Sequence, residues 1–292
     1  MSYLKNKPAL LGYLLLLGSS ASASLFVISF RGLSKSTDTL PAAMLLYLFS
    51  TLYTLPGFIW KKSWKTQIST RSWVFIGLIC ITSVLGNYFY LIAVYHIPPS
   101  VAQIIQRSDV FIGFFYGIII FKERLKFSIV IGLALCFIGL GFIFREFFTY
   151  DIPLIAIFSL LITAFCFATM QLFTKTIITE ISPNTINFLR LLISSVLLVL
   201  LTFNLQKFNF GEETFYYAAL AAFFGPFGAR TLINYAIIYA PFSTINLVLT
   251  ISPAITVFLQ YFLLGLVISP LELAGSLFIF SSIIVVGIFY RG

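Results

Sequence analysis

Charged side chains are scarce in this sequence. Asp, Glu, Lys and Arg make up 9% of its 292 residues, against 60% hydrophobic residues and a mean hydropathy of +1.04. A soluble domain carries roughly a quarter charged residues, so this chain cannot form a water-soluble surface. No long polar stretch interrupts the hydrophobic runs either, which leaves no room for an added soluble catalytic domain. The composition predicts an integral membrane protein whose surroundings are the lipid bilayer.

Side chains that bind metals or perform catalysis are equally scarce. Cys80, Cys136 and Cys166 lie singly in apolar runs without a C-x-x-C spacing, which argues against a disulfide framework or a metal site. The single histidine, His96, falls at a membrane edge beside a Pro-Pro turn. An aspartyl dyad would need two intramembrane carboxylates, and only Asp109 is available. We therefore expect no metal, no cofactor and no enzymatic activity.

Acidic residues are outnumbered, since 18 Lys and Arg face 9 Asp and Glu for a formal net charge of +9. In a soluble protein this excess would suggest nucleic acid as a partner. Here the basic residues fall mostly in short loops between apolar runs, where they set membrane orientation. Alternate loops hold eleven on one side and four on the other. We predict cytoplasmic N- and C-termini and no nucleic-acid binding.

Apolar runs of about 20 residues, the length that crosses a bilayer, recur along the whole chain. They predict ten helices, at residues 10–30, 40–60, 73–95, 99–121, 127–144, 153–173, 185–203, 215–239, 243–264 and 271–290. Pro98, Pro99 and Pro241 lie in turns so short that the flanking helices must be antiparallel neighbours. The expected fold is an all-α membrane protein with ten transmembrane helices.

The two halves of the chain can be aligned on each other. A displacement of 143 residues lays the run from residue 93 onto the run from residue 236 without gaps. The coincident pairs are Ala93/Ala236, Pro98/Pro241, Ser100/Ser243, Phe115/Phe258 and Gly132/Gly275. Their placement at a turn and at helix starts matters more than their number. Five spans in each half would invert the second half in the membrane, so we predict two inverted repeats, residues 1–146 and 147–292.

Residues 93–143 and 236–280 carry a recurring set of features. The first segment has a short turn after Ala93, the run Lys122-Glu123-Arg124 and Gly132, and the second has Ser252-Pro253 and Gly275. As a combination, this resembles the signature half of the EamA branch of the drug/metabolite transporter superfamily. The sequence departs from that pattern where Asp109-Val110 replaces the usual Ser-Pro and Leu266 replaces the acidic turn residue.

The resemblance implies a secondary transporter in a bacterial inner membrane. The family's members suggest an amino acid or a related metabolite as the substrate, with export favoured over import. Two inverted bundles would open a central site alternately to either side of the membrane. A channel or a lipid-translocating protein of the same architecture is the alternative. Monomer and homodimer are both compatible with the sequence.

Four ionisable residues fall inside predicted spans: Arg107, Asp109, Arg190 and Arg230. Each costs roughly 2.5–3.5 kcal/mol at a bilayer centre, so such residues persist mainly where they face a cavity or a partner. Arg107 and Asp109 are two positions apart, and a regular helix would point them to nearly opposite sides. We therefore expect that they do not neutralise each other. Three arginines against one aspartate favour an anionic or zwitterionic substrate.

Arg230 follows Gly225-Pro226-Phe227-Gly228, a stretch expected to kink its helix and expose backbone groups to a cavity. Its guanidinium could bind a carboxylate or phosphate, or it could pair with Asp109. Arg190 could contact a ligand or extend to the membrane interface. Asp109 has a further hypothetical role in proton coupling.

The candidate substrate-binding residues combine these charges with polar and aromatic neighbours on the same helix faces. They are Asn87, Tyr90, Gln106, Arg107, Asp109, Tyr116, Arg190, Arg230, Asn234 and Asn246. For each, fixed helix-to-helix packing is the alternative. We expect the third, fourth, eighth and ninth spans to line the site.

Overall fold

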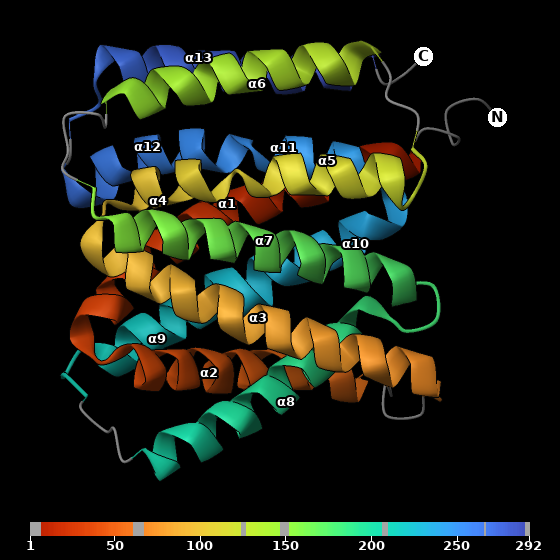
Figure 1. Ribbon diagram of the computed structural model, residues 1–292, viewed down its shortest axis with the longest axis vertical. Helices are drawn as coiled ribbons and strands as arrows, with labels where there is room; N and C mark the ends of the chain where they lie inside the picture. Colours follow the sequence, from red (N-terminus) through yellow and green to blue (C-terminus); the bar gives the residue numbers. More distant parts are fainter. Residues whose placement is uncertain are drawn as a thin grey trace.

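The protein is helical throughout the part of the chain that the computed structural model describes, residues 7–60, 67–123, 127–146, 152–205, 210–265 and 267–289 (Figure 1). The helices are α1 (Lys7–Ser36), α2 (Thr39–Trp60), α3 (Thr70–His96), α4 (Pro99–Gln106), α5 (Asp109–Ile119), α6 (Phe127–Glu146), α7 (Leu154–Ile177), α8 (Pro183–Asn204), α9 (Thr214–Ala222), the π-helix η4 (Phe223–Ala229), α10 (Arg230–Tyr239), α11 (Phe242–Leu249), α12 (Ile251–Leu264) and α13 (Pro270–Phe289). The predicted all-α fold is confirmed.

The outer faces of these helices are apolar. Side chains such as Leu52, Phe158 and Phe262 are at least 60% exposed, which a protein in water would avoid in such numbers but which suits contact with lipid. Within the described residues, six helices are long and apolar enough to cross a membrane. Helices also satisfy their own backbone hydrogen bonds, as a chain in hydrocarbon must. The molecule is therefore an integral membrane protein.

The helices follow the ten ranges predicted from hydropathy, but three of those ranges are interrupted. Residues 99–121, expected as one helix, form α4 and α5 with a break at Arg107 and Ser108. The Ser108 hydroxyl donates to the Ile105 carbonyl at 2.6 Å, and such local bonds compete with the regular helix pattern. A break at Thr250 separates α11 from α12 in the same way, with its hydroxyl donating to the Leu247 carbonyl.

The two breaks are related by the displacement found in the sequence. Helices α4 and α11 both contain 8 residues and both follow an extended proline, Pro98 and Pro241. Their bounds differ by 143 residues at each end, and so do the residues that end them, Arg107 and Thr250. The local repeat is thus present in the backbone as well as in the sequence.

The third interruption is the π-helix η4 between α9 and α10, and serines of α1 hold it in place. The hydroxyl of Ser22 donates to the Phe224 carbonyl at 2.6 Å, and that of Ser19 donates to the Ala229 carbonyl at 3.0 Å. A side chain at Gly225 would overlap the ring of Phe26. The small residues of α1 and η4 therefore allow a close approach that fixes the start of α10.

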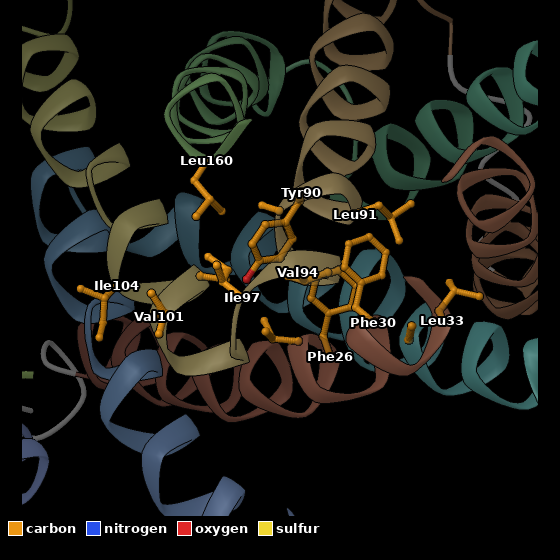
Figure 2. Packing of buried hydrophobic residues seen from close by; sticks show 14 of the residues in the cluster. Phe26, Phe30, Leu33, Tyr90, Leu91, Val94, Ile97, Val101, Ile104 and Leu160 are labelled. Carbon is orange, nitrogen blue, oxygen red and sulfur yellow. The ribbon is translucent and has the colours of Figure 1, made fainter. Parts of the chain in front are cut away.

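Aromatic rings fill the space beside this contact. Figure 2 shows Phe26, Phe30 and Tyr90 packed together in the main buried cluster. The ring centroids of Phe26 and Phe30 lie 4.5 Å apart, and those of Phe30 and Tyr90 lie 5.6 Å apart. This cluster joins α1 to α3 and so sets the position of Tyr90, one of the predicted site residues.

Helices α6 and α13 form a pair at one side of the molecule, at the top of Figure 1. Gly139 and Gly275 face each other across the pair, and a Cβ added at Gly139 would lie 2.6 Å from the Gly275 carbonyl oxygen. Small residues of this kind allow membrane helices to approach closely. Gly141 lies two positions along α6, and a Cβ there would meet none of the described residues within 4 Å.

We expect Gly139→Ala to lower the thermal stability of the purified protein in detergent, because its methyl group must displace backbone atoms of α13. Forced overpacking costs roughly 1–3 kcal/mol. Gly141→Ala is the matched control and should unfold at the wild-type temperature or above it. Equal midpoints for the two variants in a thermal-unfolding assay would contradict this account of the α6–α13 contact.

Candidate functional site

Helices from both halves of the chain surround a cavity of about 100 Å³. One buried water needs roughly 10–15 Å³ on such a scale, so the cavity has room for several waters or a small ligand. Its polar lining comes from α1, α3, α4, α5, α7, α8, α10 and α12 and from the α4–α5 break. These residues are Ser19, Ser20, Asn87, Tyr90, Gln103, Gln106, Arg107, Asp109, Gln171, Arg190, Arg230 and Ser252.

The cavity brings together seven of the ten predicted site residues, namely Asn87, Tyr90, Gln106, Arg107, Asp109, Arg190 and Arg230. The other three lie away from its lining. The Tyr116 hydroxyl is 3.0 Å from that of Thr169, and the Asn246 amide donates to the Phe242 carbonyl at 2.8 Å. Asn234 is buried on α10. Tyr116 and Asn246 therefore make helix-to-helix or local contacts.

Arg107 and Asp109 contact each other, contrary to the expectation from a regular helix. Their side chains lie 3.5 Å apart, from Nη2 to Oδ2, and both are buried. The contact is possible because α4 ends before Arg107 and α5 begins at Asp109, so the two side chains leave the chain on either side of a break. Gln106 also reaches Asp109 Oδ2, at 3.5 Å. Arg107 Nη1 donates to the Leu249 carbonyl at 3.3 Å.

Arg190 lies deep in the protein, and its acceptors among the described residues are all neutral. Its guanidinium donates to the Asn187 side-chain oxygen at 2.7 Å, to the Pro226 carbonyl at 3.1 Å and to the Ser83 hydroxyl. It is 2% exposed, so the alternative in which it extends to the membrane interface is wrong. Asn187, one turn before it, and the Pro226 carbonyl of η4 hold it inside the protein.

Arg230 is the cavity arginine with the fewest protein contacts. Among the described residues its hydrogen-bond partner is the Thr174 hydroxyl, at 3.4 Å. It does not pair with Asp109, so the predicted alternative of an Arg230–Asp109 ion pair is absent from the described structure. Arg190 and Arg230 both line the cavity. Neither has a carboxylate partner in the described chain, which makes this end of the cavity strongly positive.

Four buried polar atoms on the cavity lining have no hydrogen-bond partner among the described residues. They are the Tyr90 hydroxyl, Arg107 Nε, Asp109 Oδ1 and Gln171 Oε1. Leaving such a group unpaired costs roughly 1–3 kcal/mol, and more for a charged group, so native proteins rarely do it. Their gathering on one cavity indicates that water or a ligand completes their bonding.

Sequence reasoning missed two walls of the cavity, those formed by α1 and α7. Ser19 and Ser20 of α1 line it, as do Phe167, Met170 and Gln171 of α7. The run of small polar residues from Ser19 was the available signal on α1, and the isolated amide of Gln171 in an apolar run was the signal on α7. The predicted walls from the third, fourth, eighth and ninth spans do contribute residues.

Comparisons with known proteins agree with this architecture. The model of the EamA-like transporter family matches residues 10–145 and again residues 154–288. An uncharacterized transporter of Haemophilus influenzae is 31% identical over 101 residues, which are 34% of this chain and 33% of the relative, so the match spans about a third of each protein.

A solved crystal structure aligns with 97% of this chain and 99% of its own, with a TM-score of 0.76 and 13% sequence identity. At that identity the likeness concerns the fold alone. The two family matches cover nearly the whole sequence. The chain therefore belongs to the EamA-like transporter family.

Proposed function

We propose that this protein is a secondary transporter that moves a small zwitterionic or anionic metabolite, such as an amino acid, across the bacterial inner membrane by alternating access. The observation that carries the proposal is that Arg190 and Arg230 both line one cavity and that neither has a carboxylate partner among the described residues. Two guanidinium groups in a low-dielectric site attract an anionic group strongly. A substrate carboxylate is the simplest group that would neutralise them.

The two arginines would contribute differently. Every guanidinium nitrogen of Arg190 already donates to a neutral acceptor, so this residue supplies a fixed positive charge. Among the described residues Arg230 has one long hydrogen bond, to Thr174, so it retains donors for a ligand. A guanidinium binds a carboxylate with two parallel hydrogen bonds. We therefore assign direct substrate contact to Arg230 and electrostatic support to Arg190.

A second group of atoms suits an ammonium group. Asp109 Oδ1 and Gln171 Oε1 are buried acceptors on the cavity lining without a partner among the described residues, and the same holds for the Tyr90 hydroxyl. The ammonium group of an amino acid donates three hydrogen bonds and would satisfy such acceptors. Acceptors and arginines on one cavity therefore favour a zwitterion over a simple anion.

The transport cycle would use the internal repeat. We propose ten spans in two inverted repeats, residues 1–146 and 147–292, with both termini in the cytoplasm. The interrupted helices of the two halves, α4–α5 and α11–α12, both reach the cavity through residues at their breaks, Asp109 and Ser252 among them. Interrupted helices at a repeat interface are typical of carriers in which one half moves against the other. We propose export as the direction, which the resemblance of the sequence to the EamA branch suggests.

We expect purified protein in proteoliposomes to exchange labelled amino acids with saturable counterflow, which a channel would not show. Arg230→Gln should reduce the apparent affinity for the best substrate by about tenfold or more, the effect of losing a charge-assisted hydrogen bond. Arg145→Gln, at an exposed arginine at the end of α6, is the matched control and should transport normally. Preferential uptake of purely cationic substrates would contradict the proposed site.

Proton coupling through Asp109 is a secondary hypothesis, based on a buried carboxylate that has one unpaired oxygen and faces the cavity. Asp109→Asn keeps the shape of the side chain but cannot carry a proton on a carboxylate. The variant should transport at a rate that no longer changes when a pH gradient is imposed. If its uptake responds to the gradient as fully as that of the wild type, Asp109 is not the coupling group.

A further inference from the structure

A carboxylate at one end of the molecule joins the two halves of the chain. Glu123 lies in the connection between α5 and α6, and its Oε1 accepts from the Phe242 backbone N–H at 2.7 Å while its Oε2 accepts from the Ser243 backbone N–H at 3.0 Å. Lys175, at the end of α7, donates to Glu123 Oε1 at 2.9 Å. The end of α5, the end of α7 and the start of α11 meet on the right of Figure 1. One side chain thus ties the first half to two helices of the second.

The contact is strong on physical grounds. The first N–H groups of a helix have no partner within it and carry partial positive charge, so a carboxylate there is favoured. Lys175 also lies over the rings of Phe121 and Phe242, at 4.6 Å and 5.5 Å from their centroids. These rings shield the ion pair from solvent on one side. The contact combines an ion pair, two charge-assisted hydrogen bonds and two cation–π contacts.

The chain around Glu123 is shaped to deliver this carboxylate. Lys122 adopts a left-handed backbone conformation, with φ of 52°, and the Glu123 N–H donates back to the Gly117 carbonyl at 3.0 Å. A Cβ added at Gly117 would lie 3.2 Å from Glu123 Oε2. The glycine therefore leaves the space through which the carboxylate reaches α11.

The repeat supplies the corresponding place at the opposite end of the molecule, and the chemistry there is different. The displacement of 143 residues places Ser243 on Ser100 and Gly117 on Gln260. The Ser100 backbone N–H, at the start of α4, donates to Gln260 Oε1 at 3.2 Å. A neutral amide thus caps α4 from the position that Gly117 occupies in the other half. The counterpart of Glu123 in the sequence is Leu266, which lies outside the described residues and cannot supply a charge.

The contact also lies where a gate would be. Between Glu123 and the cavity, α5 packs tightly on α11, and a side chain at Gly113 would overlap that of Asn246. Leu249, at the far end of α11, lines the cavity. To open the cavity toward the Glu123 end, α11 and α5 would have to separate.

We propose that Glu123, Lys175 and the first N–H groups of α11 form a charged latch that holds one end of the cavity closed, whereas the opposite end is held by the weaker, neutral contact of Gln260 with Ser100. This inference rests on the proposed alternating access. The unequal contacts bias the empty transporter toward opening at the Gln260 end. Breaking the latch shifts that bias toward the Glu123 end.

A second carboxylate at the same end provides a matched control. Glu180, in the α7–α8 turn, accepts from the hydroxyls of Ser69 and Ser72 at the start of α3. It also joins distant parts of the chain, but α3 and α7 pack along their length, so they have no need to separate at this contact. Loss of its charge should leave the opening equilibrium unchanged.

The test measures the separation of α5 from the α10–α11 corner by pulsed electron paramagnetic resonance in lipid vesicles without substrate. Spin labels would be placed at Ile119 and Ile238, which are 68% and 49% exposed, after the three buried cysteines are replaced by alanine. We expect Glu123→Gln and Lys175→Met each to shift the ratio of long to short distances by about tenfold, as expected for one lost charge-assisted hydrogen bond. The wild type and Glu180→Gln should share one distribution.

If Glu123→Gln and Lys175→Met lower the unfolding temperature but leave the distance distribution unchanged, Glu123 is a structural helix cap and the latch is wrong. The distances are recorded without substrate, so this result is separate from the transport assay. Saturable counterflow with unchanged distances would overturn the latch alone. Shifted distances without saturable counterflow in the wild type would support the latch and overturn the proposed substrate class.

The pH dependence of the latch follows from the surroundings of Glu123. Burial raises the pKa of this carboxyl, but hydrogen bonds from Ser243, Lys175 and Phe242 and the charge of Lys175 outweigh it, so the net pKa lies below the ordinary value of 4.5. Because the pKa of Glu123 is lowered in the closed form, its charge stabilises that form at any pH above the ordinary carboxyl pKa. This stabilisation is lost as the pH falls through the lowered pKa. The distance distribution should therefore stay constant from about pH 8 to pH 5 and shift only in stronger acid. A transition near neutral pH would contradict the assignment.

Discussion

A buried guanidinium group must be surrounded by hydrogen-bond acceptors, and the rest of the structure depends on this constraint. Arg190 can remain inside the membrane domain because Asn187, Ser83 and the Pro226 carbonyl surround it. The Pro226 carbonyl is available at that place because η4 departs from the α-helical pattern, and η4 is held in turn by the hydroxyls of α1. A chain of polar contacts thus runs from α1 through η4 to α8. An unpaired cation in hydrocarbon would cost several kcal/mol, so these contacts are a condition of the fold.

The internal repeat gives the two halves the same backbone break and different chemistry at it. In the first half the break carries Arg107 and Asp109, and in the second half the corresponding positions are Thr250 and Ser252. Both breaks reach the same cavity, yet only the first brings charge to it. The backbone is therefore symmetric while the charges of the site are not. Arg190 and Arg230 make one part of the lining positive, and the Arg107–Asp109 ion pair lies elsewhere on it.

The helix positions could be predicted from the sequence because bilayer thickness fixes the length of an apolar run. Seven predicted site residues line the cavity because a charged or amide side chain in hydrocarbon costs free energy unless it faces a cavity or a partner. The two wrong predictions, for the Arg107–Asp109 contact and for the position of Arg190, have a common cause. The contact of Arg107 with Asp109 depends on a break that Ser108 helps to create, and the seclusion of Arg190 depends on a carbonyl from a distant π-helix. Such contacts depend on helix rotation and local irregularity, which hydropathy does not encode. The α1 wall was missed because a run of small polar residues such as that from Ser19 also suits close packing between helices.

Helix α11 connects the site to the end of the molecule. It is 8 residues long, so its two ends lie little more than two turns apart. Its start is bound by Glu123, and the carbonyl of its last residue, Leu249, accepts from Arg107. Both contacts come from charged groups of the first half acting on a short element of the second. In the proposed site, an ammonium group bound at Asp109 would weaken the contact of Asp109 with Arg107 and so change the contact at one end of α11, while Glu123 held the other end. The proposed substrate site and the proposed latch are therefore joined by a single short helix.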